Sequence, residues 1–337
     1  MPIRLILVGL GRIAIGNSEL VSGLPLSHLD AALATGNFVL SGLVDVDADR
    51  RAYALSVFPH IPVVESLAAL PKNISEVIVI CASNNVHAEL AKQALLRKPA
   101  VVVVEKPMTS NFKSAVQLAQ LVESAEAVLR INFHRRFDLR FNKWRNLRPM
   151  KPVLIEMRYG KGLLNYASHM IDWLIDWYGE IEGVRSLPLH IDKDDDSSPS
   201  FVCYMAAGFE VVILGVTGLN YDQFEIDILA ANERLMFIDG GAVIRRLKPF
   251  AGKHYSGYSH LIEEVDNEDI APVSGFIELY KAIYSYCKSG EPLAGCDHND
   301  GLLNMAVLEA VRLSISFDGK LICPRQLLWG SYQNVSI

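Results

Sequence analysis

The chain has 337 residues and a formal net charge of −6; 50% of its residues are hydrophobic and 21% are charged. This composition predicts a globular protein of about two domains. No block rich in lysine and arginine occurs, which argues against nucleic acid as a partner. No apolar run is long enough for a transmembrane helix, and residues 1–14 are too broken by glycine for a signal peptide. We therefore expect a cytoplasmic protein that does not bind membranes.

Five cysteines are spread along the chain without a C-x-x-C spacing. An odd number in this pattern is typical of reduced thiols and not of a disulfide framework or a zinc site. We therefore expect no metal centre.

The first part of the chain alternates between two kinds of segment. Apolar runs of strand length occur at residues 4–10, 38–46, 75–83, 100–106 and 127–137. Amphipathic stretches of helical period lie between or beside them, at residues 27–36, 47–58, 85–98 and 111–127. Strands that alternate with helices indicate a parallel sheet covered on both faces. We predict an α/β fold whose doubly wound Rossmann domain, at residues 1–125, binds a dinucleotide.

The pattern changes over residues 126–337. Segments rich in β-branched and aromatic residues occur at residues 152–160, 200–219 and 223–247, and helical stretches at 164–179 and 299–316. They predict an α+β domain built on a large, mostly antiparallel open sheet, which binds the substrate and whose C-terminal helix can pack back on the first domain.

Two further expectations concern this second domain. The apolar strand within residues 210–219 needs cover, which predicts a homodimer or homotetramer formed through the sheet. Residues 192–200 are polar and acidic, and we expect them to be a solvated loop with no other role.

A glycine motif follows the first apolar run. Gly9, Gly11 and Ala14 fit the pattern G-x-G-x-x-G/A. The first glycine allows a tight turn, the second lets the backbone approach a pyrophosphate, and the small third residue lets the next helix pack on the strand. The free N–H groups at the start of that helix can hold phosphate. The motif therefore predicts a bound dinucleotide.

Asp45 ends the second predicted strand, where an acid can hydrogen-bond the adenosine ribose. Its charge would repel a 2′-phosphate, which favours NAD, while Arg50 or Arg51 keeps NADP as an alternative. Asp45 could instead only cap the next helix. Gly9 and Asp45 are 36 positions apart, more than the typical ~20. The excess, residues 15–26, is either a flap over the cofactor or an ordinary surface loop.

Several short strings together resemble one family. GLGRIA, CASNNVHAELA, EKPMT, NFHRRF and GLLNYASHMID occur in the order and roughly the spacing of the glucose–fructose oxidoreductase/inositol dehydrogenase (Gfo/Idh/MocA) family. The resemblance covers nearly the whole chain and is strongest over residues 1–175. It implies an N-terminal Rossmann domain, a C-terminal domain on an open sheet, a nicotinamide cofactor, and a sugar, polyol or nucleotide-sugar substrate.

The resemblance also implies where the cofactor is held. Its pyrophosphate would lie on the glycine motif, next to Gly9, Gly11, Arg12 and Ile13. The other residues that the resemblance implies along the cofactor, from its middle to the nicotinamide, are Ser83, Asn84, His87, Glu105, Lys106 and Asn132.

Lys106 ends an apolar strand and precedes Pro107. Ligands bind at the carboxyl ends of strands in a doubly wound sheet, and proline restricts the preceding residue to extended geometry. An ammonium there can hydrogen-bond the substrate oxygen on the carbon that exchanges a hydride, and burial would ease proton transfer. We expect Lys106 to be catalytic.

Asn165, His169 and Asp172 stand at i, i+4 and i+7, so we expect them on one face of a helix. Lys161 lies between Gly160 and Gly162, which favours a loop. In the resembling family, His169 would be the acid/base, suited to it near neutral pH, and Asp172 would orient it. The family usually has aspartate at position 165. Asparagine cannot take a proton, so a Lys–Asp–His relay is not available.

The sequence thus predicts an NAD(P)-dependent dehydrogenase or reductase that transfers a hydride between nicotinamide and a carbohydrate hydroxyl or ketone. One alternative is a reductase that acts on a nucleotide sugar with NADPH. Another is an NAD-binding sensor or assembly protein without turnover, which Asn165 motivates. A last one is a lyase or hydrolase with transient oxidation.

Overall fold

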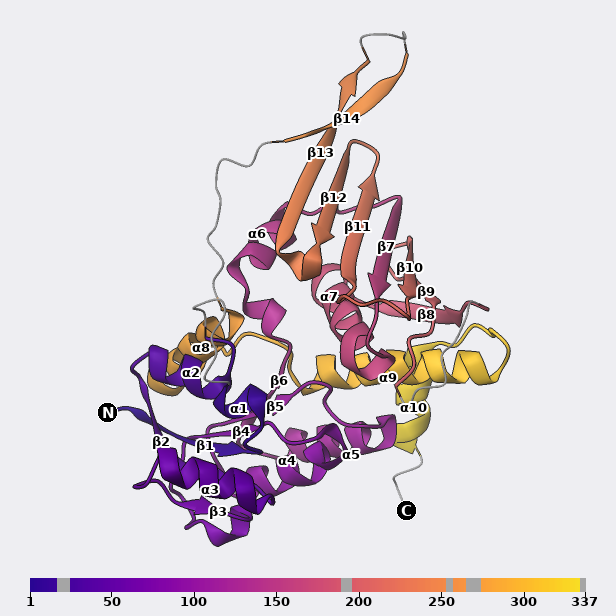
Figure 1. The fold of residues 1–337 in the computed structure, drawn as a ribbon. Coiled ribbons are helices and arrows are strands. Elements are labelled where there is room, and N and C mark those ends of the chain that lie inside the picture. Colours follow the sequence, from indigo (N-terminus) through magenta and orange to yellow (C-terminus); the bar gives the residue numbers. More distant parts are fainter. Residues whose placement is uncertain (17–24, 189–195, 253–256, 265–273, 334–337) are drawn as a thin grey trace. The chain divides into compact units, whose positions relative to one another are not determined.

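The computed structural model describes residues 1–16, 25–188, 196–252, 257–264 and 274–333. Most of the segment expected as a flap or loop, residues 17–24, lies outside them. The chain divides into two compact units, Met1–Leu139 with Pro272–Met305, and Arg140–Ala271 with Ala306–Ile337. Each unit contains its own sheet (Figure 1). Within the described residues, no helix is both long and apolar enough to cross a membrane.

The first unit is built on a six-stranded sheet in the order β3-β2-β1-β4-β5-β6. Every neighbouring pair is parallel. This order is that of the doubly wound dinucleotide-binding fold, and it confirms the predicted parallel sheet. The strands are β1 Ile3–Val8, β2 Phe38–Val44, β3 Val63–Val64, β4 Val77–Ile80, β5 Val101–Glu105 and β6 Val128–Asn132.

Helices cover both faces of this sheet. In Figure 1, α3, α4 and α5 lie on one face, and α2 and α8 lie on the other. The helices are α1 Arg12–Ile15, α2 His28–Ala34, α3 Ala48–Val57, α4 His87–Leu95, α5 Phe112–Glu123 and α8 Gly275–Ser289. Short 3₁₀ turns are η1 Leu67–Ala69, η2 Asn84–Val86 and η3 His134–Phe137. A last helix, α9 His298–Ser316, begins in the first unit and ends in the second.

The core of the first unit follows from strands that are apolar on both sides. All residues of β4 and β5 are buried. Side chains of alternate residues point to opposite faces, so Val101 and Val103 join the cluster that contains Phe276 and Tyr280 of α8. Polar side chains are therefore found at the ends of these strands and not along them.

The second unit is built on an eight-stranded sheet in the order β14-β13-β12-β11-β7-β10-β9-β8. Only β10 and β7 pair in parallel among the described strands of this sheet, which confirms the predicted, mostly antiparallel sheet. The strands are β7 Leu154–Tyr159, β8 Ile181–Ser186, β9 Phe201–Met205, β10 Glu210–Gly215, β11 Phe224–Ala230, β12 Glu233–Ile238, β13 Val243–Ala251 and β14 Ser259–Glu263. Its helical segments are α6 Leu139–Leu147, the π-helical turn η4 Leu163–Ala167, α7 Ser168–Tyr178, η5 Asp239–Gly241 and α10 Pro324–Gln333.

The two faces of this second sheet differ in chemistry. One face is apolar, and Trp173 and Trp177 of α7 contact Phe237 there, with ring centroids 6.0 and 5.6 Å apart. The opposite face carries ion pairs between neighbouring strands, such as Arg158–Glu225 at 3.1 Å and the Arg234–Asp227 pair. The oligomer was expected from the apolar strand within residues 210–219. In β10, Val211 and Ile213 are buried, and Val212 and Leu214, which alternate with them, are half-buried, so the oligomer stays a prediction.

Candidate cofactor and substrate sites

The glycine turn after β1 leaves no room for a side chain at its first position. Gly9 has φ +84°, and a Cβ there would lie 2.6 Å from the backbone nitrogen of Ala82, which follows β4. At Gly11 the space is open, because a Cβ would meet only Arg50 Nη1, at 3.7 Å, among the described atoms. The turn is thus tight at Gly9, where it meets the end of β4, and open at Gly11, where a pyrophosphate could approach the protein backbone.

The start of α1 offers backbone donors at the same turn. The first intrahelical bonds run from the N–H groups of Ala14 and Ile15 to the Gly11 carbonyl, at 3.0 and 3.2 Å. The earlier N–H groups of Arg12 and Ile13 come before the first helical acceptor and point out of the helix end. Ala14 is fully buried, as expected of the small third residue that lets helix and strand pack.

Asp45 lies directly after β2 and is 6% exposed. Its Oδ2 accepts a 2.6 Å hydrogen bond from the Leu10 N–H in the glycine turn, and its Oδ1 accepts one of 2.9 Å from the Asp47 N–H. The cap of α3 is Asp47, which accepts from the N–H groups of Asp49 and Arg50. The alternative that Asp45 only caps the next helix is therefore wrong.

The two candidate arginines have different surroundings. Arg51 Nη1 donates to the carbonyls of Asp45 and Val46, at 2.8 Å each, and so braces the end of β2. Arg50 keeps a half-exposed side chain, with its Nη1 3.6 Å from Asp45 Oδ2. Of the two, Arg50 is the one positioned to meet a ligand phosphate.

A cavity of about 420 Å³ opens at the carboxyl ends of β1, β2, β3 and β4. Asp45, Arg50 and Ser83 are among the residues that line it. The remaining lining residues are Val8, Gly9, Val44, Val46, Glu65, Ser66, Leu67, Ala82, Asn85, Val86, Leu90 and Gln93. No pattern in the sequence singled out Glu65 and Ser66, because they follow a strand of only two residues.

His87 is 1% exposed, and its ring joins two loops. Nδ1 lies 2.9 Å from the carbonyl oxygen of Pro107, and Nε2 lies 2.9 Å from that of Ala82. Both nitrogens are thus engaged by the protein, so the geometry makes His87 a brace for the loop after Lys106. Asn84 lies in η2 and is partly exposed, next to the lining residues Ser83 and Asn85.

The carboxyl ends of β5 and β6 carry a buried polar cluster. Glu105 Oε1 accepts from His28 Nε2 at 2.9 Å and from Asn132 Nδ2 at 2.6 Å. Glu105 Oε2 accepts from the backbone N–H of Lys106 at 3.2 Å. Burial by itself would raise the pKa of Glu105, but the hydrogen bonds and charge of its neighbours, His28 first, lower it. Lys106 follows at the strand end and is partly exposed.

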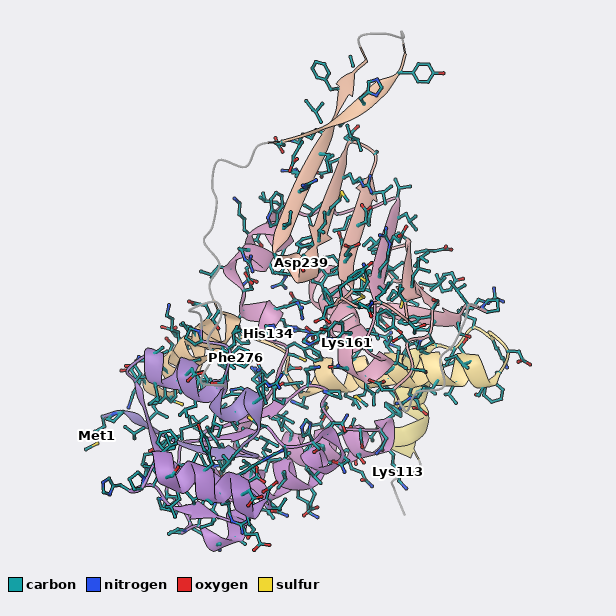
Figure 2. All side chains as sticks on the ribbon, viewed as in Figure 1. Met1, Lys113, His134, Lys161, Asp239 and Phe276 are labelled. Carbon is teal, nitrogen blue, oxygen red and sulfur yellow. The ribbon has the colours of Figure 1, made fainter. Side chains whose placement is uncertain are left out.

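His134 lies just beyond β6, where its ring stacks on Phe276 with centroids 5.4 Å apart; both are labelled in Figure 2. Burial lowers the pKa of His134 to about 4, and the charge of Arg135 acts in the same direction. The ring is therefore neutral at pH 7.

In the second unit, the residues expected on one helix face are split between two kinds of helix. Asn165 lies in the π-helical turn η4 and is exposed, whereas His169 and Asp172 lie on α7 and are 6% and 3% exposed. The expectation of one regular helix through all three was wrong, because the π turn changes the spacing before α7. Phe224 packs edge-on against His169, with centroids 6.4 Å apart.

Asp196 explains why the chain turns there. Its carboxylate accepts from the N–H groups of Leu164 and Asn165, at 2.8 and 3.0 Å. At Gly162, which has φ +93°, a Cβ would lie 2.1 Å from that carboxylate. The expectation that residues 192–200 have no role was wrong for the described residues 196–200; residues 192–195 lie outside the described chain.

Lys161 lies in a loop, as expected from its flanking glycines. Its ammonium pairs with the Asp222 carboxylate, which also accepts from the Tyr166 hydroxyl at 3.1 Å. The hydrogen bond between the two lowers the pKa of Asp222 and raises that of Lys161. These groups line or adjoin a polar pocket of about 460 Å³ whose other lining residues are Gly160, Gly162, Asp196, Ser198, Val216, Thr217, Gly218, Leu219, Asn220, Tyr221 and Gln223.

Metal ligands do not gather in the part of the chain that the structure describes. No three His, Cys, Asp or Glu side chains are placed there to hold an ion, and all five cysteines are free thiols.

The parallel sheet order, the glycine turn and the cavity beside Asp45 together define a class. The first unit is a dinucleotide-binding Rossmann domain, and it is joined to an α+β domain on a mostly antiparallel sheet.

Comparison with known proteins finds a family whose model is similar to most of the first unit. Residues 3–133 match the model described as the oxidoreductase family with an NAD-binding Rossmann fold. Over these residues the chain is similar to the Gfo/Idh/MocA oxidoreductases, the family that its sequence motifs resemble.

One curated relative and several solved structures are similar. An uncharacterized oxidoreductase of Schizosaccharomyces pombe is 28% identical over 169 residues, which cover 41% of this chain and 46% of the relative. The match thus spans about half the length of that relative.

Three structures represent the fold along almost the whole chain. An oxidoreductase of Agrobacterium radiobacter in complex with NAD⁺, L-tartaric acid and magnesium has a TM-score of 0.74 and 13% identity, covering 97% of this chain and 100% of its own. The UDP-N-acetylglucosamine 3-dehydrogenase of Acidithiobacillus ferrooxidans has a TM-score of 0.75 and 16% identity, and the match covers 93% of this chain and 97% of its own. The transcriptional regulator Gal80p of Kluyveromyces lactis has a TM-score of 0.73 and 15% identity, and the match covers 97% of this chain and 95% of its own. At this identity the three show the shared fold alone.

Proposed function

We propose that this protein transfers a hydride between the nicotinamide of NAD(P) and a hydroxyl-bearing or ketone carbon of a carbohydrate, which includes polyols and nucleotide sugars. The observation that carries the proposal is the placement of chemistry at one edge of the parallel sheet. Asp45 ends β2 beside a cavity of about 420 Å³. Glu105, Lys106 and Asn132 end β5 and β6, in the other half of the fold. A dinucleotide spans both halves of such a sheet.

The residues of the first unit suit this cofactor. Gly11 and the N–H groups of Arg12 and Ile13 offer an open cradle for the pyrophosphate. Asp45 can accept from ribose hydroxyls, because each carboxylate oxygen has more than one lone pair. The bound cofactor supplies the hydride acceptor or donor, and the protein has to supply proton transfer and orientation.

We assign proton transfer to Lys106 and His169. Lys106 would hydrogen-bond the substrate oxygen whose carbon exchanges the hydride, and His169 would act as acid/base. Asp172, three residues further along α7, would orient His169. Asn165 would hold the substrate through its amide, since it cannot take a proton.

The substrate class rests on the polar pocket of the second unit. Its side chains include Lys161, Asp222 and Asn220, which are donors and acceptors of the kind that sugar hydroxyls need. A structure with the same fold is a UDP-N-acetylglucosamine 3-dehydrogenase. That function is carried to this chain only as support for a carbohydrate.

The test is turnover of a panel of sugars, polyols and nucleotide sugars, followed at the nicotinamide absorbance. We expect Lys106→Met to lower kcat by about 10²–10⁴-fold, the usual contribution of a positioned acid/base, with NAD affinity unchanged. Lys113→Met is the matched control, because Lys113 is an exposed lysine on α5 of the same unit (Figure 2). Wild-type turnover by the Lys106→Met protein refutes the assignment.

A nucleotide-sugar reductase that uses NADPH is the second candidate, and Arg50 favours it. The half-exposed Arg50 guanidinium lies in the cavity beside Asp45, where it could pair with a 2′-phosphate. Calorimetry of NAD and NADP binding separates the two candidates. If Asp45 decides, Asp45→Ser raises NADP affinity relative to NAD by about tenfold; if Arg50 decides, Arg50→Ala lowers it by a similar factor.

A sensor or assembly protein that binds NAD without turnover is a third candidate. Asn165 favours it, and Gal80p shows that a transcriptional regulator has this fold. Tight NAD binding with no turnover of any compound in the panel would select it. The homodimer or homotetramer remains a prediction, which light scattering tests.

A further inference from the structure

A buried chain of hydrogen bonds runs through the first unit to the end of β6. The Tyr280 hydroxyl lies 3.1 Å from His28 Nδ1, and His28 Nε2 lies 2.9 Å from Glu105 Oε1. Asn132 Nδ2 donates to the same oxygen at 2.6 Å. Tyr280 and His28 are fully buried, and Asn132 and Glu105 are 1% and 8% exposed. These residues come from α8, α2, β6 and β5, so the fold brings them together from distant parts of the sequence.

The hydrogen bond between His28 and Glu105 in this chain of bonds has a defined direction. A carboxylate beside His28 Nε2 requires the hydrogen on that nitrogen, while His28 Nδ1 faces the Tyr280 hydroxyl at 3.1 Å. Tyr280 therefore holds the ring in the orientation in which Nε2 donates to Glu105. Although burial favours the protonated acid, the pKa of Glu105 is lowered, mainly by its bond to His28. Glu105 is thus held as an anion.

An ionised Glu105 determines which way the Asn132 amide points. A carboxylate only accepts hydrogen bonds, so Asn132 has to present its NH₂ group to Glu105 and its Oδ1 to the other side. That Oδ1 is buried and has no hydrogen-bond partner in the described structure. A buried acceptor without a donor is rare in folded proteins and needs an explanation, which a donor on a bound ligand would supply.

Its place in the fold indicates the ligand. Asn132 is the last residue of β6, in register with Glu105 of β5, and ligands of a doubly wound sheet bind at the carboxyl ends of its strands. Asp45 and the cavity beside it occupy the half of the sheet suited to adenosine. The half that ends in Glu105 and Asn132 is left for nicotinamide, whose carboxamide NH₂ is a donor.

We propose that Tyr280 and His28 are positioning residues that act through Glu105, so that Asn132 Oδ1 accepts a hydrogen bond from the nicotinamide carboxamide. The inference rests on the cofactor of the proposed function, but not on turnover. It adds two residues that no motif marked and assigns one bond to a named atom. A purely structural role for the chain makes no distinction between cofactors that differ only in that NH₂ group.

The experiment compares two ligands by calorimetry on the intact protein. One is NAD⁺; the other is 3-acetylpyridine adenine dinucleotide, in which a methyl group replaces the carboxamide NH₂. We expect the wild type to bind the analogue about tenfold more weakly, the effect of leaving one buried acceptor unpaired. If the 2′-phosphorylated cofactor binds more tightly, the corresponding phosphorylated pair is used.

Four variants locate the cause. Asn132→Ala removes the acceptor, and Glu105→Gln lets the Asn132 amide turn over, because a glutamine amide can donate to Oδ1; both should bring the affinity ratio to within about twofold of one. His28→Phe keeps the ring that packs edge-on to Phe276 and Tyr280 but removes the bond to Glu105, and the ratio should fall. Tyr280→Phe should give a smaller fall in the same direction.

Glu126→Gln is the matched control for Glu105→Gln. Glu126 is 80% exposed as a side chain and pairs loosely with Lys98, at 3.9 Å, so its loss should leave the ratio at the wild-type value. Circular dichroism of each variant confirms folding, and if Glu105→Gln does not fold, Asn132→Ala and His28→Phe decide.

The outcomes separate the two proposals. A wild-type ratio near one, or a ratio that Asn132→Ala and His28→Phe leave unchanged, overturns this inference even if the protein turns over a sugar. The expected ratios in a protein without turnover support it while overturning the proposed hydride transfer. A protein that binds neither dinucleotide overturns both.

Discussion

The two units place polar chemistry by opposite rules. In the parallel sheet of the first unit, all residues of β4 and β5 are buried, and charged or amide side chains appear where strands end, at Asp45, Glu105 and Asn132. In the mostly antiparallel sheet of the second unit, charged side chains also lie along the strands, with ion pairs such as Arg234–Asp227 between adjacent strands.

The difference follows from what covers each sheet. A sheet with helices on both faces needs apolar side chains on both, so ligand-binding groups collect at one edge. A sheet with an apolar and a polar face can carry charges along its strands. Polar groups at the edge of the first sheet are therefore buried and interlocked. Most of those on the second sheet are partly exposed, such as Arg158, which pairs with both Glu156 and Glu225.

The largest expected effect tests how closely the strand ends of the first unit approach one another. Gly9→Ala would place a methyl group 2.6 Å from the Ala82 nitrogen at φ +84°, and we expect a loss of about 3 kcal/mol in the free energy of unfolding by urea. Gly36→Ala is the control. Gly36 also has a positive φ, +67°, but no described atom lies within 4 Å of the added methyl, so about 1 kcal/mol is expected. Equal losses would contradict the close approach.

The next effect concerns His134, which lies just beyond β6. The unfolded His134 takes up a proton below its ordinary pKa of 6.5, whereas the folded ring does so only near pH 4. Since the unfolded state then binds more protons, stability falls as the pH drops. From pH 8 to pH 5 this group should cost about 2 kcal/mol. Urea unfolding should show this loss in the wild type and a smaller one in His134→Phe; parallel pH dependences would remove His134 as the cause.

The smallest effect tests the charged face of the second sheet. Asp227→Asn weakens a two-bond contact with Arg234, whose Nε lies 2.9 Å from Oδ1, and we expect about 1 kcal/mol in unfolding free energy. Glu263→Gln breaks the Arg245–Glu263 pair, in which the atoms lie 3.6 Å apart and both side chains are more than half exposed, and should change little. A loss above about 3 kcal/mol for Asp227→Asn would mean that this face resembles the buried edge of the first sheet.

Local patterns were enough for much of the fold. Val101–Glu105 is a strand because a β-branched run suits the sheet, and Ser27 caps α2 by accepting from the Asp30 N–H. Gly9 and Ala14 could be chosen from spacing, since the glycine turn has the same shape wherever a strand feeds a helix in this way. Asp45 could be chosen from its place at the end of the second predicted strand.

The π turn at Asn165 could not be read from the sequence. The spacing of Asn165, His169 and Asp172 suits a regular helix, and it is the Asp196 carboxylate, bound to the N–H groups of Leu164 and Asn165, that holds the turn. Asp196 comes from a polar stretch without periodicity, and no local rule connects it to a helix start some thirty positions earlier.

What the sequence by itself determined is the class of the protein: a parallel sheet with a glycine turn, an acid after the second predicted strand, a lysine after the fourth, and a second domain of mostly antiparallel strands. What only the tertiary structure decided is which polar groups meet. His28, Glu105, Asn132 and Tyr280 share one hydrogen-bond chain although residues as far as 252 positions apart contact one another. Periodicity reports how a segment packs against its surroundings. The partner of a buried donor or acceptor is set by long-range contacts, which leave no local pattern in the chain.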